Sequence, residues 1–234
     1  MKKIFLFLLI ISSININSQV KTISVDYGLT IGDDQIYQES GTMRDHYNLA
    51  IENAKYLSFN LFITENETEF TLKEILDTSN NGIAYSKIFS GFNSNIYIDN
   101  SSATMYETRN DILGKYVLQR PVVNMAWEVS SETKLIQGLI CYKATANEVV
   151  INPVNTFTFL ITAWFCPEIP ISSGPLGFGG LPGLILELHR RNVVYGANKI
   201  NTNPETKIVK LPSLEKVVTV EELKKMRQDF LDSK

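Results

Sequence analysis

Histidine and cysteine are scarce in this chain of 234 residues, which contains two of each. His46 and His189 stand far apart, and no His-x-x-x-His or Cys-x-x-Cys pair offers the clustered ligands that a zinc site needs. A Gly-x-Ser-x-Gly nucleophile elbow is missing as well. The sequence therefore predicts no metal site, no cofactor and no catalytic residue, and it favours a protein that is not an enzyme.

Long hydrophobic runs are also missing. The apolar run at residues 4–11 follows two lysines and is too short for the ~20 residues that cross a bilayer. With the polar stretch that ends near Gln19, it predicts a cleaved signal peptide at residues 1–19 and a single β-rich domain at residues 20–234. The first cysteine is Cys141, so no lipid-bearing cysteine follows the cleavage site. We expect an exported protein, periplasmic or secreted, that neither spans the membrane nor carries a lipid anchor.

Basic residues are few and dispersed. The chain has 22 lysines and arginines against 25 acidic residues, a net charge of -3. Without the two lysines of the signal peptide, 20 basic residues face 25 acidic ones and the net charge is -5. The longest basic run is His189-Arg190-Arg191. Because phosphate binding needs a basic patch, a nucleic-acid partner is not expected and an anionic membrane surface is disfavoured.

Most of the chain alternates apolar and polar residues in short segments separated by Asn, Gly, Pro and Ser, the pattern of β-strands. The fold class is therefore mainly β (α+β), with a curved antiparallel sheet or half-barrel. The predicted strands cover residues 22–29, 56–64, 95–98, 103–108, 116–120, 124–129, 138–145, 149–151, 156–165, 184–188 and 206–210.

Two segments have helical spacing instead. From Thr42 to Ala54 the apolar residues recur every three or four positions, which predicts a helix before the strand at 56–64. The segment from Thr219 to Glu222 has the capping-box pattern and precedes an apolar face, which predicts a C-terminal amphipathic helix. Residues 80–82 and 201–204 are interpreted as turns.

Cys141 and Cys166 flank a turn signal that contains Pro153. A hairpin centred between residues 153 and 154 pairs residues whose numbers sum to 307, so the two cysteines face each other across the strands. Export to an oxidising compartment makes a strained structural disulfide the first hypothesis. The alternatives are two buried free thiols and, less favoured, a redox or metal-binding pair.

In the second strand of this hairpin, one face carries Phe157, Phe159, Ile161, Ala163 and Phe165. We predict that this face lies in the core. The other face carries Trp164 and the cysteines, so it is partly apolar and we expect something to cover it.

Glycine and proline concentrate after Cys166. Half of the eight prolines and five of the thirteen glycines lie in residues 167–183, interleaved with large apolar residues. Helices and central strands are excluded there, so we expect an ordered, packed loop. One interpretation is a pocket wall formed by Trp164, Glu168, Phe178 and Leu181; the preferred one is a rigid connection that seals an open barrel end.

The glycines of this segment do not form a nucleotide-binding motif. A dinucleotide fingerprint does not fit because Pro182 stands where glycine is needed, and a P-loop does not fit because no Gly-Lys-Ser/Thr follows.

The hexapeptide Gly180-Leu181-Pro182-Gly183-Leu184-Ile185 resembles the motif that names the GLPGLI family of exported Bacteroidetes proteins. The resemblance extends to the segments 127–129, 132–134, 140–145, 163–170 and 174–175, in order, over about 60 residues. One departure is the stretch 155–161, where relatives are expected to carry arginines. The family has no assigned reaction, so the resemblance implies export and no particular activity.

The leading hypothesis is a non-enzymatic, carrier-like module that binds an apolar or peptide-like ligand or an outer-membrane partner. A structural envelope protein without a small-molecule site is the alternative. A hydrolase is the third hypothesis, and it would require Glu168, His189 and Arg190 to gather in one cleft. Outside the hydrolase hypothesis, His46 is expected to be exposed and His189 to lie at the solvated rim of a strand.

Overall fold

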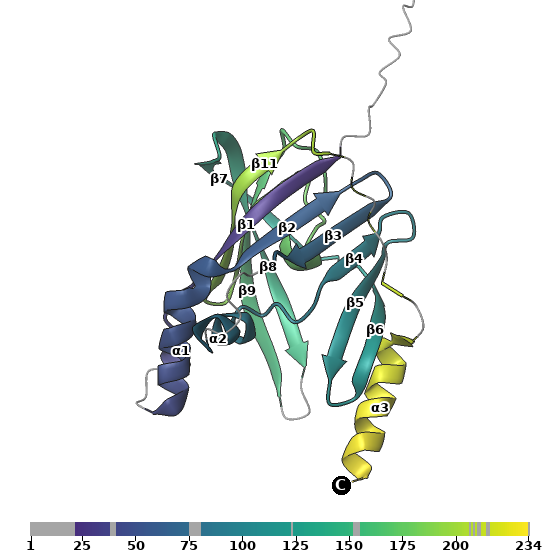
Figure 1. Cartoon of the computed structure of the whole chain (residues 1–234). Helices are drawn as coiled ribbons and strands as arrows, with labels where there is room; N and C mark the ends of the chain where they lie inside the picture. Colours follow the sequence, from purple (N-terminus) through teal and green to yellow (C-terminus); the bar gives the residue numbers. More distant parts are fainter. Residues whose placement is uncertain are drawn as a thin grey trace, which may run out of the picture.

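The computed structural model describes residues 22–37, 41–74, 81–122, 124–151, 155–205, 207, 209, 212–213 and 216–233. The predicted signal peptide and the hairpin turn around Pro153 lie outside these residues. Within them, twelve strands form one sheet in the order β12-β6-β5-β4-β3-β2-β1-β11-β10-β9-β8-β7, as Figure 1 shows in part. The strands are β1 (Ile23–Ile31), β2 (Ser58–Ile63), β3 (Glu67–Leu72), β4 (Ile96–Asp99), β5 (Thr104–Asp111), β6 (Gly114–Pro121), β7 (Glu128–Ile136), β8 (Leu139–Ile151), β9 (Thr156–Cys166), β10 (Leu184–Arg190), β11 (Val193–Asn201) and β12 (Val217–Thr219).

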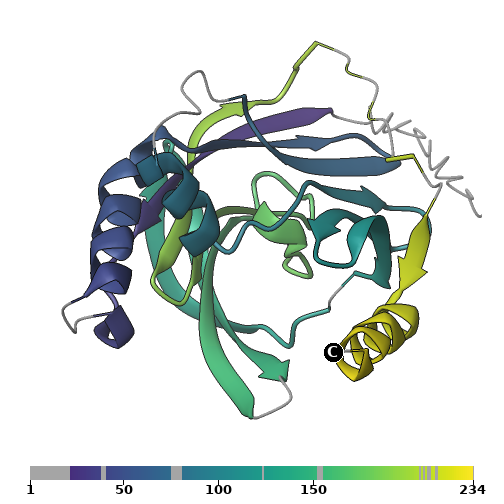
Figure 2. The same cartoon turned by 60° about the horizontal axis from the view of Figure 1, so that its bottom comes forward.

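The sheet curves strongly, and in Figure 2 its strands surround a central space. Only the short β12 runs parallel to its neighbour, β6. The predicted mainly β fold with a curved, largely antiparallel sheet is therefore confirmed. Period-two alternation explains why one face of the sheet is buried. In β1 every second residue from Ile23 to Ile31 is buried, while the residues between them are more exposed.

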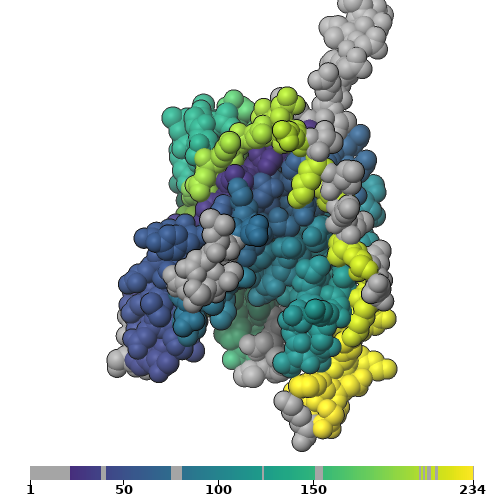
Figure 3. All heavy atoms as spheres, viewed as in Figure 1, coloured from purple at the N-terminus to yellow at the C-terminus, as the bar shows by residue number. Residues whose placement is uncertain are grey.

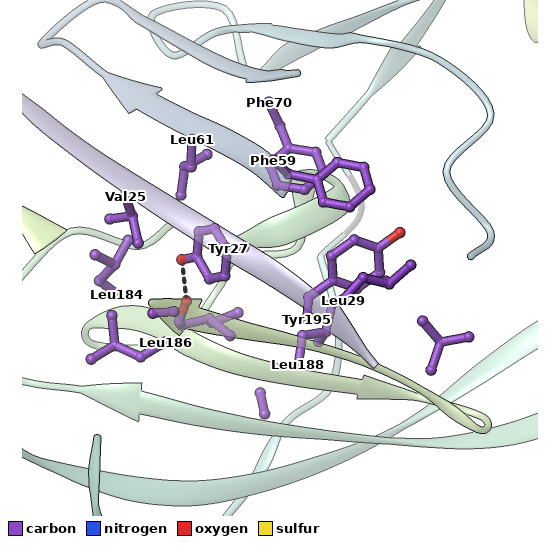
Figure 4. Packing of buried hydrophobic residues seen from close by; sticks show 14 of the residues in the cluster. Val25, Tyr27, Leu29, Phe59, Leu61, Phe70, Leu184, Leu186, Leu188 and Tyr195 are labelled. Atoms are coloured by element: carbon purple, nitrogen blue, oxygen red, sulfur yellow. Dashed lines mark hydrogen bonds between the residues drawn. The ribbon is translucent and has the colours of Figure 1, made fainter. Parts of the chain in front are cut away.

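Aromatic side chains from β1, β2, β3 and β11 pack together in the core. Tyr27, Phe59, Phe70 and Tyr195 are at most 1 % exposed, and their rings pack edge to face or stacked. The Tyr27 hydroxyl donates a 2.6 Å hydrogen bond to the carbonyl of Ile185, which ties β1 to β10 (Figure 4). Burial raises the pKa of the Tyr27 hydroxyl well above its usual value.

Helix α1 (Thr42–Asn53) confirms the prediction from residue 42 onward. Helix α2 (Asn81–Phe89) corrects the interpretation of residues 80–82 as a turn, because Asn81 and Gly82 begin a helix. The Ser86 hydroxyl donates a 2.8 Å hydrogen bond to the carbonyl of Ala50, so the two helices pack closely. His46 stacks on Tyr85 at 4.1 Å between ring centroids and is half-buried rather than exposed as expected.

The C-terminal helix α3 (Val220–Asp232) confirms the capping-box prediction. Thr219 accepts a hydrogen bond from the backbone of Glu222, and the Glu222 carboxylate accepts one from the backbone of Thr219. Leu223 packs with Tyr116, Leu118 and Val218 in a small apolar cluster on β6 and β12. None of the helices among the described residues is long and apolar enough to cross a membrane.

Several strands differ from the prediction. The sequence reading missed β3, β11 and β12, divided the continuous β8 into two strands, and placed β7 too early at 124–129. Only residues 207 and 209 of the predicted strand 206–210 are described, and neither lies in a strand. The hairpin register is confirmed, because Tyr142 pairs with Phe165 and Ile151 with Thr156, both sums being 307.

The phenylalanine face of β9 is buried only in part. Ile161, Ala163 and Phe165 lie in the core as predicted, whereas Phe157 is 40 % exposed and Phe159 is half-buried. The reason is length: β10 pairs with β9 only as far as Ile161, so the far end of the β8–β9 hairpin extends past its neighbour.

Candidate functional site

The glycine and proline segment, residues 167–183, crosses the concave side of the sheet. It contains the short helix η3 (Pro175–Gly177), which contacts β3 and β4 on the opposite side from β9 (Figure 2). The indole Nε1 of Trp127 donates a 2.7 Å hydrogen bond to the carbonyl of Gly179, and the Gly180 amide donates one of 2.7 Å to the Ser172 hydroxyl. The segment is therefore an ordered connection inside the sheet.

A cavity lies beside this segment, with a volume of about 420 Å³. Its walls come from both halves of the curved sheet: β4, β5 and β6 on one side, β8 and β10 on the other, and η3 between them. Gly177 has φ +76°, a left-handed conformation that favours glycine, and its Cα lies against the methyl group of Met105 of β5. The site thus joins strands that are distant in the sequence.

Two clusters of ion pairs line this cavity. On one wall Glu107, whose side chain is 5 % exposed, accepts hydrogen bonds from Arg109 and, at 2.5 Å, from Arg120 Nε. On the opposite wall Glu148 accepts two bonds of 2.8 Å from Nε and Nη2 of Arg190. Three arginines against two glutamates leave one positive charge in excess within the cavity.

The rest of the lining is mixed. Ile96 and Met105 are buried, and Phe178, Leu176 and Met125 are partly buried against the core, so they supply apolar surface. Beyond the cavity, the partly exposed Phe157 and Phe159 rings stack with their centroids 6.1 Å apart. The arrangement suits a ligand that has both a charged and an apolar part.

The four residues predicted to form a pocket wall do not line one pocket together. Phe178 lines the cavity, whereas Leu181 is 2 % exposed in the core and Glu168 is exposed. Trp164 lies under Lys134, whose Nζ is 4.3 Å from the ring centroid. Within the hexapeptide, Leu184 and Ile185 are fully buried, so this motif serves mainly as a packing anchor.

Sequence reasoning missed the charged residues of the cavity. Glu107, Arg120 and Glu148 were not among the predicted site residues, and Arg190 was predicted only as part of a basic run and of the hydrolase trio with Glu168 and His189. A charged residue inside a strand of alternating apolar and polar residues could have pointed to a site. Alternation alone, however, does not show which strands face each other across a cavity.

His189 and Arg190 point to separate partners. Arg190 binds Glu148, while His189 Nε2 contacts the Glu187 carboxylate, to which Lys134 Nζ also donates at 2.6 Å. The hydrogen bond from His189, followed by that from Lys134, holds the pKa of Glu187 below its usual value. With Glu168 exposed elsewhere, the described residues do not form the trio that a hydrolase would require.

Cys141 and Cys166 are both buried and are free thiols in the structure. The confirmed register, continued by one residue from the pair Tyr142–Phe165, sets them opposite each other. Burial, and then the neighbouring Cys166, raises the pKa of the Cys141 thiol to about 12. A protonated thiol is a poor nucleophile, so Cys141 is unsuited to thiol catalysis at neutral pH.

A cluster of three or more His, Cys, Asp and Glu side chains that could hold a metal ion is not found in the part of the chain that the structure describes. The arginines of the cavity are the only cationic groups in its lining.

Comparisons with known proteins give a family match over one segment and a likeness in fold. A family model described as "Protein of unknown function (Porph_ging)" matches residues 152–187, which confirms the resemblance to the GLPGLI family over that segment. No curated protein gives a significant match.

Two solved structures of PNGF-II, in the P21 and C2 space groups, are similar in fold, with TM-scores of 0.52 and 0.50 and sequence identities of 14 % and 13 %. Each aligns with 88 % of this chain, which spans only about a third of theirs (33 % and 32 %). At this identity the likeness extends to the fold alone.

Proposed function

We propose that this protein is an exported, non-enzymatic binding module of the cell envelope, and that its ligand occupies the cavity between β5–β6 and β8–β10. The observation that carries the proposal is the excess guanidinium charge inside a cavity of about 420 Å³, a size typical of small-ligand sites. The ligand is expected to carry an anionic group and an apolar portion, as a peptide-like molecule does.

The charge supports an anionic group. Arg120 reaches Glu107 through Nε, and within the described part of the chain its two Nη groups make no hydrogen bond, so they can serve a ligand on that wall. Glu107 and Glu148 hold the arginines in place, and a guanidinium held in this way can bind a carboxylate through two parallel hydrogen bonds.

A purely apolar ligand fits less well. It would cover ion pairs without replacing the water around them, and the desolvation of charged groups is costly. The apolar surface of Met105 and Phe178 instead suits one part of a ligand whose other part is charged. Of the two expected ligand classes, apolar and peptide-like, we therefore propose the peptide-like one.

A fluorescent probe of matching chemistry tests the site. Anilinonaphthalene sulfonate has aromatic rings and one sulfonate, and we expect it to bind saturably with one-to-one stoichiometry. Asn147→Trp places a large side chain at the exposed rim of the cavity and should weaken binding at least about tenfold. Ser131→Trp, on the exposed face of β7 outside the lining, is the matched control and should leave binding unchanged.

Two results would contradict the proposal: the wild-type protein shows no saturable binding, or Asn147→Trp binds the probe as well as Ser131→Trp does. Native mass spectrometry of protein purified from its own envelope then identifies the natural ligand by its added mass. The alternative of an accessory protein without a small-molecule site predicts neither probe binding nor added mass.

Export is proposed from the signal pattern at residues 1–19. The intact mass of protein isolated from cells should lack this segment. A full-length mass that begins at Met1 would overturn the proposal.

We also propose that Cys141 and Cys166 form a disulfide in the exported protein. Each thiol loses one proton, and two electrons pass to a protein disulfide of the oxidising compartment, which is reduced to a dithiol. Because both thiols are buried in the folded protein and burial raises the pKa of the Cys141 thiol, the bond should form during folding, before the hairpin is covered. Alkylation under denaturing conditions without reductant should leave both cysteines unmodified, whereas two added alkyl groups would show free thiols.

A further inference from the structure

A second, more open depression lies outside the cavity, between the end of α2 and the β5–β6 hairpin. It has a volume of about 870 Å³ and is lined by residues of β3, α2, the loop 92–95, β5, β6 and the segment before β12. Figure 3 shows the α1–α2 pair and the β5–β6 hairpin as separate projections at the lower side of the molecule. We call this depression the basic groove.

Charge distinguishes the basic groove from the rest of the molecule. Among the residues that the structure describes, its lining holds five basic residues and one acidic residue, Glu74, in a chain whose net charge is -3. Among the described residues, Lys73 pairs with Asp26 at 3.2 Å and Arg109 pairs with Glu107. The five basic residues are Lys73, Lys87, Arg109, Lys115 and Lys216.

Three of these lysines are available to a ligand. Lys87, Lys115 and Lys216 are exposed, and no ion pair within the described part of the chain involves them. They come from α2, from β6 and from the turn before β12, so only the fold brings them together. Like charges gathered in this way repel one another, and an anionic ligand would relieve the repulsion.

The lining also contains uncharged hydrogen-bonding side chains, namely Asn93, Ser94, Asn95, Thr108, Asn110 and Ser213, beside the apolar or aromatic Leu72, Phe92, Tyr116, Val117 and Pro212. Amide and hydroxyl side chains can form hydrogen bonds with the hydroxyl groups of sugars, and lysines can form ion pairs with carboxylate or sulfate groups. We propose that the basic groove binds an acidic oligosaccharide.

The shape of the groove and its apolar content disfavour other polyanions. A flat bilayer cannot enter a depression, and a nucleic-acid single strand is usually bound on exposed aromatic platforms. The lining has two aromatic residues, and neither is an exposed platform. Phe92 packs against Phe59 and Phe70 with ring centroids 5.0 and 5.9 Å away, and Tyr116 is 4 % exposed in the small apolar cluster with Leu223. Extended peptides are normally recognised by a sheet edge or by apolar pockets, and polar amides dominate here instead.

This inference goes beyond the cavity ligand and does not depend on it. The basic groove shares Asn93, Ser94 and Arg109 with the cavity, but the three exposed lysines lie outside the cavity lining. Variants of these lysines therefore test the basic groove while leaving the cavity intact.

The experiment measures binding of a fluorescently labelled oligogalacturonate to the purified protein by anisotropy at low and at physiological ionic strength. The test variant is Lys87→Gln/Lys115→Gln/Lys216→Gln. Its control is Lys199→Gln/Lys224→Gln/Lys225→Gln, which changes the net charge equally at exposed positions of β11 and α3. An exposed ion pair changes an equilibrium constant about threefold, so the test variant should weaken binding about 30-fold and the control less than about twofold.

Binding should also weaken as salt is added and should vanish for the methyl-esterified oligomer, which has no carboxylates. A sulfated oligosaccharide compared with the uronate shows which anionic group is preferred, and either preference supports the proposal. Four results would overturn it: no binding of either acidic sugar, equal loss in both triple variants, equal binding of the methyl ester, or stronger binding of polyglutamate, single-stranded DNA or anionic phosphatidylglycerol vesicles. Thermal melting of both triple variants should match the wild type, since the exchanged side chains are exposed.

Discussion

Replacing Gly183 by alanine should destabilise the protein, because backbone atoms already occupy the place of the new methyl group. A Cβ at this position would lie 2.6 Å from the carbonyl carbon of Cys166 and 2.9 Å from the nitrogen of Pro167. The carbonyl oxygen of Cys166 would lie closer still. Ordinary contacts of a Cβ begin at 3.4 Å, so the two chain segments would have to separate by at least about 0.8 Å. No side-chain rotation can relieve a clash with backbone atoms.

The cost follows from the bonds at this point. Leu184 pairs with Cys166 in the β9–β10 ladder, and its amide donates a 3.0 Å hydrogen bond to the carbonyl of Ile169. Weakening one or two such bonds costs about 1 kcal/mol each. Overpacking typically adds about 1–3 kcal/mol. We therefore expect a loss of about 3 kcal/mol, which lowers the Tm of a protein of this size by roughly 6–12 °C.

Thermal melting followed by circular dichroism, together with urea unfolding, measures this loss. Gly196→Ala in β11 is the matched control, because a Cβ there meets nothing within 4 Å and the backbone does not have positive φ. The control should stay within about 0.5 kcal/mol of the wild type. If Gly183→Ala melts within the same margin, the close approach of residue 183 to Cys166 is not a constraint on the fold and the reasoning is refuted.

Three further predictions concern charged and capping groups. Glu107→Gln should lower the free energy of unfolding by about 2–3 kcal/mol, because it removes the charge partner of Arg109 and Arg120 at a nearly buried position; an unchanged urea midpoint would contradict this. Thr219→Ala removes the side-chain cap of α3 and should destabilise that helix by about 1 kcal/mol, seen as faster hydrogen exchange at its first amides, whereas unaltered exchange would show that the cap contributes nothing. Because the pKa of Glu187 is lowered by its partners His189 and Lys134, its contribution to stability is present above the ordinary value of 4.5 and is lost as the pH falls through the lower, folded value. The wild type should thus lose more stability on acidification than Glu187→Gln, and identical pH profiles of the two proteins would argue against the assignment.

Local signals in the sequence predicted local structure well. The turn signal that contains Pro153 predicted the β8–β9 register to the residue, and the capping box predicted the start of α3. Both depend on interactions between residues close in sequence, where turn geometry and capping chemistry decide the result.

Structure that depends on tertiary packing was harder to predict. Asn81-Gly82 is a turn signal, yet these residues begin α2, because Gly82 is buried and Ser86 binds the backbone of α1. Strand β11 contains Gly196 and Asn198, which weaken a strand pattern, and it forms because β1 and β10 pair with it on both sides. The cavity has the same origin, since Glu107 and Glu148 face it from strands that only the curvature of the whole sheet brings near each other.

The residues that identify the family and those that line the cavity have largely separate roles. The hexapeptide buries Leu181, Leu184 and Ile185 in the core, and its glycines allow the close backbone approaches that fold the segment across the sheet. By contrast, the charged residues of the cavity, Glu107, Arg109, Arg120, Glu148 and Arg190, all lie outside residues 152–187, which the family model matches. A chain can therefore keep the hexapeptide, and with it the wall formed by η3, while the opposite walls change their charge. The hexapeptide thus serves to anchor the segment in the core, and the charge of the cavity comes from the strands around it.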